Sequence, residues 1–137
     1  KEATNIQSSV ENSENYNKLS WKQLLNISQN NLFTLGAHSN FHDILSKQPK
    51  KKMEQDIKSS IKILSQKTKR DIIHYSYPEG QFEHYNNNVI KALKNNGIEC
   101  CPSAIYGQNT KKTELFCLKR IMVGFKNINL PINFLEN

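Results

Sequence analysis

Two histidines four positions apart, His38 and His42, are the residues of this sequence whose types and spacing best suit metal chemistry. They closely follow the short apolar run 32–35, which predicts a buried strand. In open α/β sheets and in barrels, ligands collect beyond the C-terminal ends of the strands. Neutral imidazoles bind zinc and other borderline divalent ions, so the pair predicts a metal site, with capping or packing histidines as the alternative. We expect the neighbouring Ser39 and Asp43 to orient the ligands.

A second candidate turn, Tyr-Pro-Glu-Gly at 77–80, follows another apolar segment. Backbone N–H groups after a strand-ending proline can point into a site and stabilise the oxyanion formed during acyl transfer. An ordinary turn that closes a strand is the alternative. His84 comes shortly after this turn, where it either overhangs the same face or is an exposed loop histidine.

The elements that must position these residues alternate between helix and strand. A capping box of Ser20 and Gln23 begins the first helix, apolar residues spaced by three and four identify the second, and Gly97 ends the third. The predicted helices cover about 21–29, 49–67 and a segment around 89–96, and the predicted strands cover 32–35, 72–77, 98–101 and a broken fourth at 115–118 and 121–123. This alternation indicates an α/β fold with a parallel sheet and right-handed crossovers.

The 137 residues suffice for one domain, and their 36% hydrophobic content indicates a modest core. Residues 1–18 are poor in large apolar side chains, so we expect a mobile or extended lead segment before a domain at 19–137. The aromatic residues Trp21 and Phe41 are interpreted as core, with contact to a sugar ring as the alternative. His74, inside an apolar strand, is expected to be a hydrogen-bonded core residue.

The charge and the cysteines argue against several classes of protein. The formal charge of +7 comes from basic runs spread over several segments, which indicates a solvated surface and no nucleic-acid partner. Cys100 and Cys101 are adjacent and Cys117 is alone, which suits small buried residues better than a disulfide framework or a Cys-x-x-Cys metal pair. No segment is long and apolar enough for a transmembrane helix, and no signal peptide is visible.

Five sequence elements, in order, resemble the polysaccharide deacetylase family, also called the NodB-homology domain. The most specific is His-Ser-x-x-His at 38–42, which is followed by Tyr-Pro-x-Gly at 77–80. The others are Leu-Ser-Trp-Lys-Gln-Leu at 19–24, Leu-Lys-x-x-Gly-Ile at 93–98 and Leu-Lys-Arg-Ile at 118–121, so the resemblance extends over about 19–123. It implies a distorted (β/α) barrel and a metal-dependent hydrolase that removes acetyl groups from N-acetylated, sometimes O-acetylated, sugars of a polysaccharide.

The resemblance also implies roles for single residues. His38 and His42 would bind a divalent metal, expected to be zinc, together with an aspartate, and the metal would activate the attacking water. A second aspartate would act as the general base. The backbone N–H of Glu79 would donate to the oxyanion. Substrate contacts are expected from Tyr77, Pro78 and His84.

Parts of the family pattern have no counterpart in this sequence. No aspartate precedes Asp43, so the Asp-Asp strand of the family is absent, and no Leu-x-His element follows His84. The arginine of the fuller third motif is also replaced, because Ser76 and Tyr77 stand before the proline. We therefore expect the C-terminal portion of a longer enzyme, or an oligomer that covers the open sheet edge.

The sequence thus predicts part of a polysaccharide deacetylase, which the resemblance places outside the cytoplasm or in the cell envelope. The alternative is a catalytically inactive module that keeps the fold and serves carbohydrate binding or assembly. A third hypothesis, a basic nucleic-acid-binding domain, requires a clustered lysine face with stacking aromatic residues.

Overall fold

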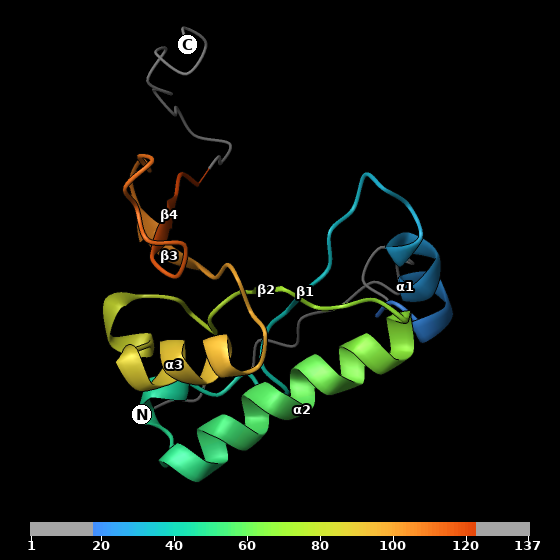
Figure 1. Cartoon of the computed structure of the whole chain (residues 1–137), viewed down its shortest axis with the longest axis horizontal. Coiled ribbons are helices and arrows are strands. Elements are labelled where there is room, and N and C mark those ends of the chain that lie inside the picture. The colour runs from blue at the N-terminus through green and yellow to red at the C-terminus, as the bar shows by residue number, and fades with distance from the viewer. Residues whose placement is uncertain (1–17, 123–137) are drawn as a thin grey trace, which may run out of the picture.

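The computed structural model describes residues 18–122, in which helices alternate with short strands (Figure 1). In chain order the elements are α1 (Trp21–Ser28), β1 (Gly36–Ala37), the 3₁₀ turn η2 (Leu45–Lys47), α2 (Lys50–Thr68), β2 (His74–Tyr75), the 3₁₀ turn η3 (Phe82–His84), α3 (Asn87–Asn95), β3 (Pro102–Tyr106) and β4 (Leu118–Arg120). The expectations for the lead segment and for the chain beyond Met122 fall outside the described residues, and they stay predictions.

The strands are parallel, as the alternation of elements predicts. Gly36 lies opposite His74 in the β1–β2 pair, and His74 also forms a parallel bridge with Cys100. β3 and β4 form a second parallel pair, in which Pro102 lies opposite Leu118. The α/β class with parallel strands is therefore confirmed for the described residues, whereas the closed barrel stays a prediction.

The strand predicted at 32–35 is wrong, because these residues form a turn and an extended connection between α1 and β1. Leu32 is 88% exposed and Phe33 is 57% exposed, and the Phe33 N–H donates to the Asn30 carbonyl oxygen at 3.1 Å. Pairing with β2 begins only at Gly36. Apolar character alone therefore does not identify this strand.

The other predicted strands are shorter than expected or displaced. The affected segments are 72–77, 98–101, and 115–118 with 121–123. β2 keeps only two residues of 72–77, and segment 98–101 contributes a single bridge at Cys100 before β3 begins. β4 begins at the last residue of the predicted half 115–118 and ends before the half 121–123. These segments are not regular strands because some of their backbone hydrogen bonds lie outside a strand ladder. The Cys101 N–H, for example, donates to the Leu115 carbonyl oxygen in an irregular connection.

The three predicted helices are confirmed. At the start of α1, the Ser20 and Gln23 side chains each accept a hydrogen bond from the other residue's backbone N–H, so the predicted capping box forms. Pro49 caps α2 rather than opening its first turn, and Gly97 follows α3 with a φ of +80°. Because these signals are local, they could be read from neighbouring residues alone.

The core lies between the strands and the helices α2 and α3, which share one side of β1 and β2 (Figure 1). Buried residues of the strand region alternate with residues on the other face, as a period of two requires. The buried set from this region is Ala37, Tyr75, Tyr77, Cys101 and Ser103. The opposite face lines a cavity of about 540 Å³ and comprises Thr34, Gly36, His38, His74, Ser76, Cys100 and Pro102, with Ala37 and Tyr75 at its border.

Two interpretations of core residues are wrong. Trp21 is 49% exposed and Phe41 is 68% exposed, and the Trp21 ring is covered only in part, by the Lys67 side chain of α2. His74 is half-buried, and its ring has no hydrogen bond to any group within 18–122, so it differs from the satisfied core histidine that we expected. Of the three cysteines predicted to be buried, Cys101 is fully buried, whereas Cys100 and Cys117 are only partly buried. In the part of the chain described here, no helix combines the length and apolar character needed to cross a bilayer.

Candidate functional site

His38 and His42 lie side by side just beyond the C-terminal end of β1. Their ring centroids are 4.9 Å apart, and the ring planes meet at 69°. Both residues are exposed to solvent. The structure therefore brings together the two imidazoles that the spacing predicted as a pair, at the end of the sheet where α/β proteins bind ligands.

The orientation of the His38 ring is set by the neighbouring strand. Its Nδ1 atom lies 2.8 Å from the carbonyl oxygen of Ser76, the residue that follows β2. Because a carbonyl oxygen only accepts, this contact requires a proton on Nδ1, and in the neutral ring Nε2 is then the atom with a free lone pair. Histidines that bind metals commonly use this arrangement.

The loop between the histidines is held in an uncommon backbone conformation. Ser39 and His42 have φ values of 64° and 60°, in the left-handed region that residues other than glycine seldom adopt. The Ser39 hydroxyl oxygen accepts hydrogen bonds from the N–H groups of Phe41 at 3.2 Å and of His42 at 2.8 Å. Ser39 thus holds the loop that carries His42, and its role in orienting metal ligands stays a prediction.

Asp56 on α2, a residue that sequence reasoning missed, supports the same loop. Its Oδ1 accepts the Asn40 N–H at 2.9 Å, and its Oδ2 accepts the Phe41 N–H at 3.3 Å and the Ser39 hydroxyl at 3.4 Å. The carboxylate belongs to a residue that is only 4% exposed. The signal in the sequence was its place between Met53 and Ile57 on the apolar face of the helix, where a charged side chain needs partners.

The expectation for Asp43 is wrong. Its carboxylate lies 3.0 Å from the Lys52 Nζ in a partly exposed ion pair, and it makes no hydrogen bond to the loop between the histidines. Sequence proximity to His42 was misleading, because the Asp43 side chain pairs with Lys52 of α2 and not with the loop. The acidic residue that supports the loop comes instead from the helix that follows.

Tyr75 lies beneath this loop and has an unusual hydroxyl group. The residue is 1% exposed, and its hydroxyl oxygen has no hydrogen-bond partner among the described residues. Burial raises the pKa of the Tyr75 hydroxyl well above its usual value, and the nearby charge of Asp56 raises it further. The neighbouring Ser60 side chain and Ser39 backbone lower this pKa slightly, although neither forms a hydrogen bond of normal geometry with the hydroxyl. The hydroxyl therefore stays neutral at any physiological pH.

The Pro78-Glu79-Gly80 turn is tightly wound and firmly anchored. Glu79 has a φ of 60°, and the Gly80 N–H donates to the Pro78 carbonyl oxygen at 2.7 Å. The Gly80 carbonyl oxygen accepts the Ala104 N–H from β3 at 2.8 Å. Within residues 18–122 the Glu79 N–H donates to no other group. The turn thus offers one backbone donor beyond the C-terminal end of β2.

The residues predicted to contact substrate lie around this turn in different ways. Tyr77 and Pro78 are buried, and the Tyr77 hydroxyl donates to the Phe116 carbonyl oxygen at 3.0 Å while its ring stacks on Tyr85 at 4.2 Å. The His84 Nδ1 accepts the N–H of Gln81 at 3.2 Å. These contacts support the turn itself, and contact of the three residues with a substrate stays a prediction.

The described residues contain no group of three histidine, cysteine or acidic side chains that could hold a metal ion. The His38–His42 pair thus supplies two of the donors that a catalytic zinc site requires, and both are nitrogen ligands that suit this metal. The pair fits a divalent metal only if a further ligand joins it.

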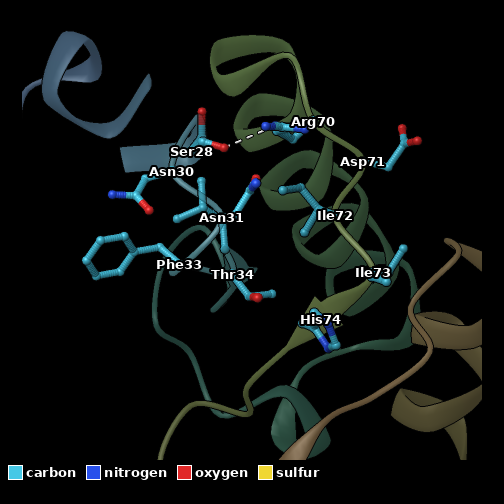
Figure 2. Close-up of a pocket in the computed structure, with 11 residues that line it drawn as sticks. Ser28, Asn30, Asn31, Phe33, Thr34, Arg70, Asp71, Ile72, Ile73 and His74 are labelled. Atoms are coloured by element: carbon cyan, nitrogen blue, oxygen red, sulfur yellow. Dashed lines mark hydrogen bonds between the residues drawn. The ribbon is translucent and has the colours of Figure 1, made fainter. Parts of the chain in front are cut away.

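Cavities adjoin the site on both sides of β1. His38 lines the 540 Å³ cavity and also a smaller one of about 180 Å³, to which Trp21 and Asn40 contribute. A third cavity, of about 350 Å³, lies between the segments that enter β1 and β2, near the Arg70 side chain, which donates to the Ser28 carbonyl oxygen (Figure 2). It is at the opposite end of the strands, so the chemistry predicted for His38 and Glu79 does not take place there.

Comparisons with known proteins agree on one family. A sequence model of polysaccharide deacetylases matches residues 3–101. The deacetylase PplD of Streptococcus pyogenes, in complex with acetate, has a similar structure, with a TM-score of 0.71 and 19% identity over 80% of this chain and 47% of that chain. Comparison with curated protein sequences gives no match.

Two further solved structures have the same fold. The deacetylase domain of BpsB from Bordetella bronchiseptica has a TM-score of 0.67 and 21% identity, over 74% of this chain and 48% of that chain. IcaB from Ammonifex degensii has a TM-score of 0.67 and 17% identity, over 82% of this chain and 51% of that chain. The chain spans about half the length of the structures that it matches.

Proposed function

Because the chain belongs to the polysaccharide deacetylase family, we propose that it supplies part of the active site of a hydrolase that removes acetyl groups from N-acetylated sugars. The observation that carries the proposal is the paired arrangement of His38 and His42, with the first ring oriented by the Ser76 carbonyl oxygen. Such a pair at the C-terminal end of a parallel strand has the ligand type, the tautomer and the position that a catalytic metal needs.

His38 and His42 would hold a divalent metal, for which zinc is our choice because both donors are imidazole nitrogens. When bound, such a metal lowers the pKa of a coordinated water and so supplies a nucleophile for the acetyl carbonyl. The remaining ligand, a carboxylate in our proposal, comes from outside residues 18–122, since the described residues offer no third donor. In this proposal the general base also comes from outside residues 18–122.

The Glu79 N–H is the oxyanion donor in this proposal. It has no competing acceptor within the described residues, and the bonds of Gly80 to Pro78 and Ala104 fix the turn before any substrate arrives. A donor that is already oriented stabilises the developing charge without a cost of reorganisation. The buried Tyr77 and Pro78 shape this turn from below, and His84 is proposed to face the sugar.

The substrate in this proposal is an N-acetylated polysaccharide, and the protein acts outside the cytoplasm or in the cell envelope. We further propose that the strands of this chain form part of a distorted (β/α) barrel, whose interior is the face lining the 540 Å³ cavity. Either another segment of the same protein or a second copy completes that barrel. The similarity to deacetylase folds over about half their length supports this arrangement.

A non-catalytic carbohydrate-binding or assembly module is the weaker candidate, because the family match spans both the histidine pair and the Glu79 turn. The two proposals differ in what they predict for metal and for turnover. The non-catalytic module binds saccharide without releasing acetate and is indifferent to chelators.

The first test is a zinc titration by calorimetry in a buffer free of chelators, on the longest product of the gene and on its His42→Ala variant. We expect binding of one zinc per chain that weakens at least about tenfold in the variant, because one of two nitrogen ligands is removed. Asp43→Asn is the control, since its carboxylate already pairs with Lys52. Equal binding by all three proteins would show that the histidines are not the ligands.

Activity is tested on the longest product of the gene, by acetate release from an N-acetylated oligosaccharide. The deacetylase proposal expects release that EDTA and His42→Ala both abolish. Saccharide binding with no acetate release, unchanged by EDTA, would instead support the non-catalytic module.

A further inference from the structure

Asp56 is a buried acid whose charge is balanced in an unusual way. It lies on the core-facing side of α2, and no lysine or arginine within 18–122 forms an ion pair with it. A buried carboxylate without a cationic partner needs hydrogen-bond donors at both oxygens. Here every donor comes from one short segment, Ser39–Phe41.

That segment is the connection between the two predicted metal ligands. Its first residue, Ser39, and the residue that follows the segment, His42, both have left-handed backbone, a conformation that persists only when surrounding bonds hold it. The Ser39 hydroxyl oxygen holds the loop from within, by accepting two of its N–H groups. Asp56 holds it from outside and ties it to α2, the longest helix among the described residues, with 19 residues.

We propose that Asp56 is a positioning residue, which fixes the 39–41 loop so that the His38 and His42 rings stay together as a pair. This inference rests on the metal-binding role proposed above. His38 is already oriented by the Ser76 carbonyl oxygen, whereas no hydrogen bond to the His42 ring is present among the described residues. The loop conformation therefore decides where the His42 ring lies, and Asp56 acts on the metal through it.

The test compares two aspartates with the same substitution and the same change in charge. Asp56→Asn is nearly isosteric but places an NH₂ donor against one of the loop N–H donors. Asp43→Asn removes a carboxylate that is next to His42 in the sequence and pairs only with Lys52. If proximity in the sequence mattered, the second variant would have the larger effect.

Amide hydrogen exchange reads the position of the loop without any metal. In the wild-type chain we expect protection of the Asn40 and Phe41 amides, whose N–H groups donate to Asp56. In Asp56→Asn we expect the protection factors of these two amides to fall at least about tenfold, while amides in the middle of α2 keep their protection. Asp43→Asn should leave both amides unchanged. Unchanged protection in Asp56→Asn would overturn the proposal.

Zinc affinity, measured by calorimetry, shows whether loss of the Asp56 carboxylate disturbs the His38–His42 pair. Loss of a residue that orients metal ligands typically weakens affinity by about 10- to 100-fold, which is our expectation for Asp56→Asn, with no change for Asp43→Asn. Equal affinities in both variants would overturn the proposal. These titrations use the longest product of the gene, because the proposed third ligand lies outside residues 18–122. If its wild-type form binds no zinc, the metal-binding role is refuted, and the exchange measurement still decides whether Asp56 fixes the loop.

A second variant covers the case in which Asp56→Asn does not fold, as judged by circular dichroism. Asp56→Glu keeps both carboxylate oxygens on the same helix face. We expect it to retain protection of the Asn40 and Phe41 amides and zinc affinity within about threefold of wild type. A folded Glu variant without that protection would count against Asp56 as the residue that positions the loop.

Discussion

The buried polar side chains behind the histidine loop differ in whether their polar atoms form hydrogen bonds. Asp56 receives hydrogen bonds at both oxygens, and the Tyr77 hydroxyl donates to the Phe116 carbonyl oxygen. The Tyr75 hydroxyl, buried in the same core, has no partner among the described residues. Because an unmade buried hydrogen bond costs more than a made one contributes, these residues should respond differently to removal of their polar atoms.

The two tyrosines provide a matched pair of substitutions. Tyr75→Phe removes a buried hydroxyl without a partner, so we expect the free energy of unfolding to stay the same or rise by up to about 1 kcal/mol. Tyr77→Phe leaves the Phe116 carbonyl oxygen without its donor, so we expect the free energy of unfolding to fall by about 1–2 kcal/mol. Urea unfolding followed by circular dichroism measures both. A larger loss in the first variant would show that the Tyr75 hydroxyl has a partner in solution.

At the scale of elements, the strands matter less for their length than for the turns that follow them. β1 and β2 have two residues each, yet both lead into turns with positive φ, at Ser39 and Glu79. Such turns expose backbone and side-chain groups at one end of the sheet. Their conformation depends on contacts with the next elements, α2 for the first turn and β3 for the second.

Gly80 is the position where the second turn admits no side chain. Its φ is +71°, and a Cβ atom there would lie 2.8 Å from the Ala104 backbone nitrogen. Gly97 also has a positive φ, of +80°, but a Cβ atom there would meet nothing within 4 Å. We expect Gly97→Ala to cost about 1 kcal/mol in stability from conformation alone, and Gly80→Ala to cost about 3 kcal/mol or more.

Thermal or urea unfolding of the two glycine variants tests this expectation. Gly80→Ala should also shift the NMR signal of the Glu79 amide, because the backbone must move away from β3. If both variants lose the same stability, the close approach of Gly80 to Ala104 does not constrain the turn.

At the scale of the whole molecule, the two faces of the short sheet have opposite environments. Helices α2 and α3 cover one face (Figure 1). The other face lines the 540 Å³ cavity. The adjacent cysteines report on this difference, since Cys100 lines the cavity and Cys101 is 0% exposed. Burial also raises the pKa of the Cys101 thiol to about 12, against a smaller increase for Cys100.

Thiol labelling follows from this arrangement. At pH 8 we expect a maleimide to modify Cys100 at least about tenfold faster than Cys101, because the reagent needs access and some thiolate. Cys101 should react only when the chain unfolds in urea. Tandem mass spectrometry, which fragments the peptide between the two adjacent cysteines, distinguishes the two sites. Equal rates in the native chain would show that the core side of the sheet opens readily.

The local elements and the chemistry of the ligands could be predicted from the sequence, because both depend on nearby residues. The capping box at Ser20 and Gln23 defined the start of α1, and apolar spacing defined α2. The two histidines at a spacing of four form a pair in space as expected. Short-range hydrogen bonds and side-chain periodicity suffice for such features.

Strand boundaries and the support of the site were decided only by tertiary structure. Leu32 and Phe33 have the character of strand residues and yet are exposed, since pairing depends on β2, which is distant in the sequence. Asp43 is next to His42 but pairs with Lys52, whereas Asp56 reaches the loop because α2 packs beneath it. The sequence by itself determined which groups can do chemistry, and packing between distant segments decided which of them are held in place.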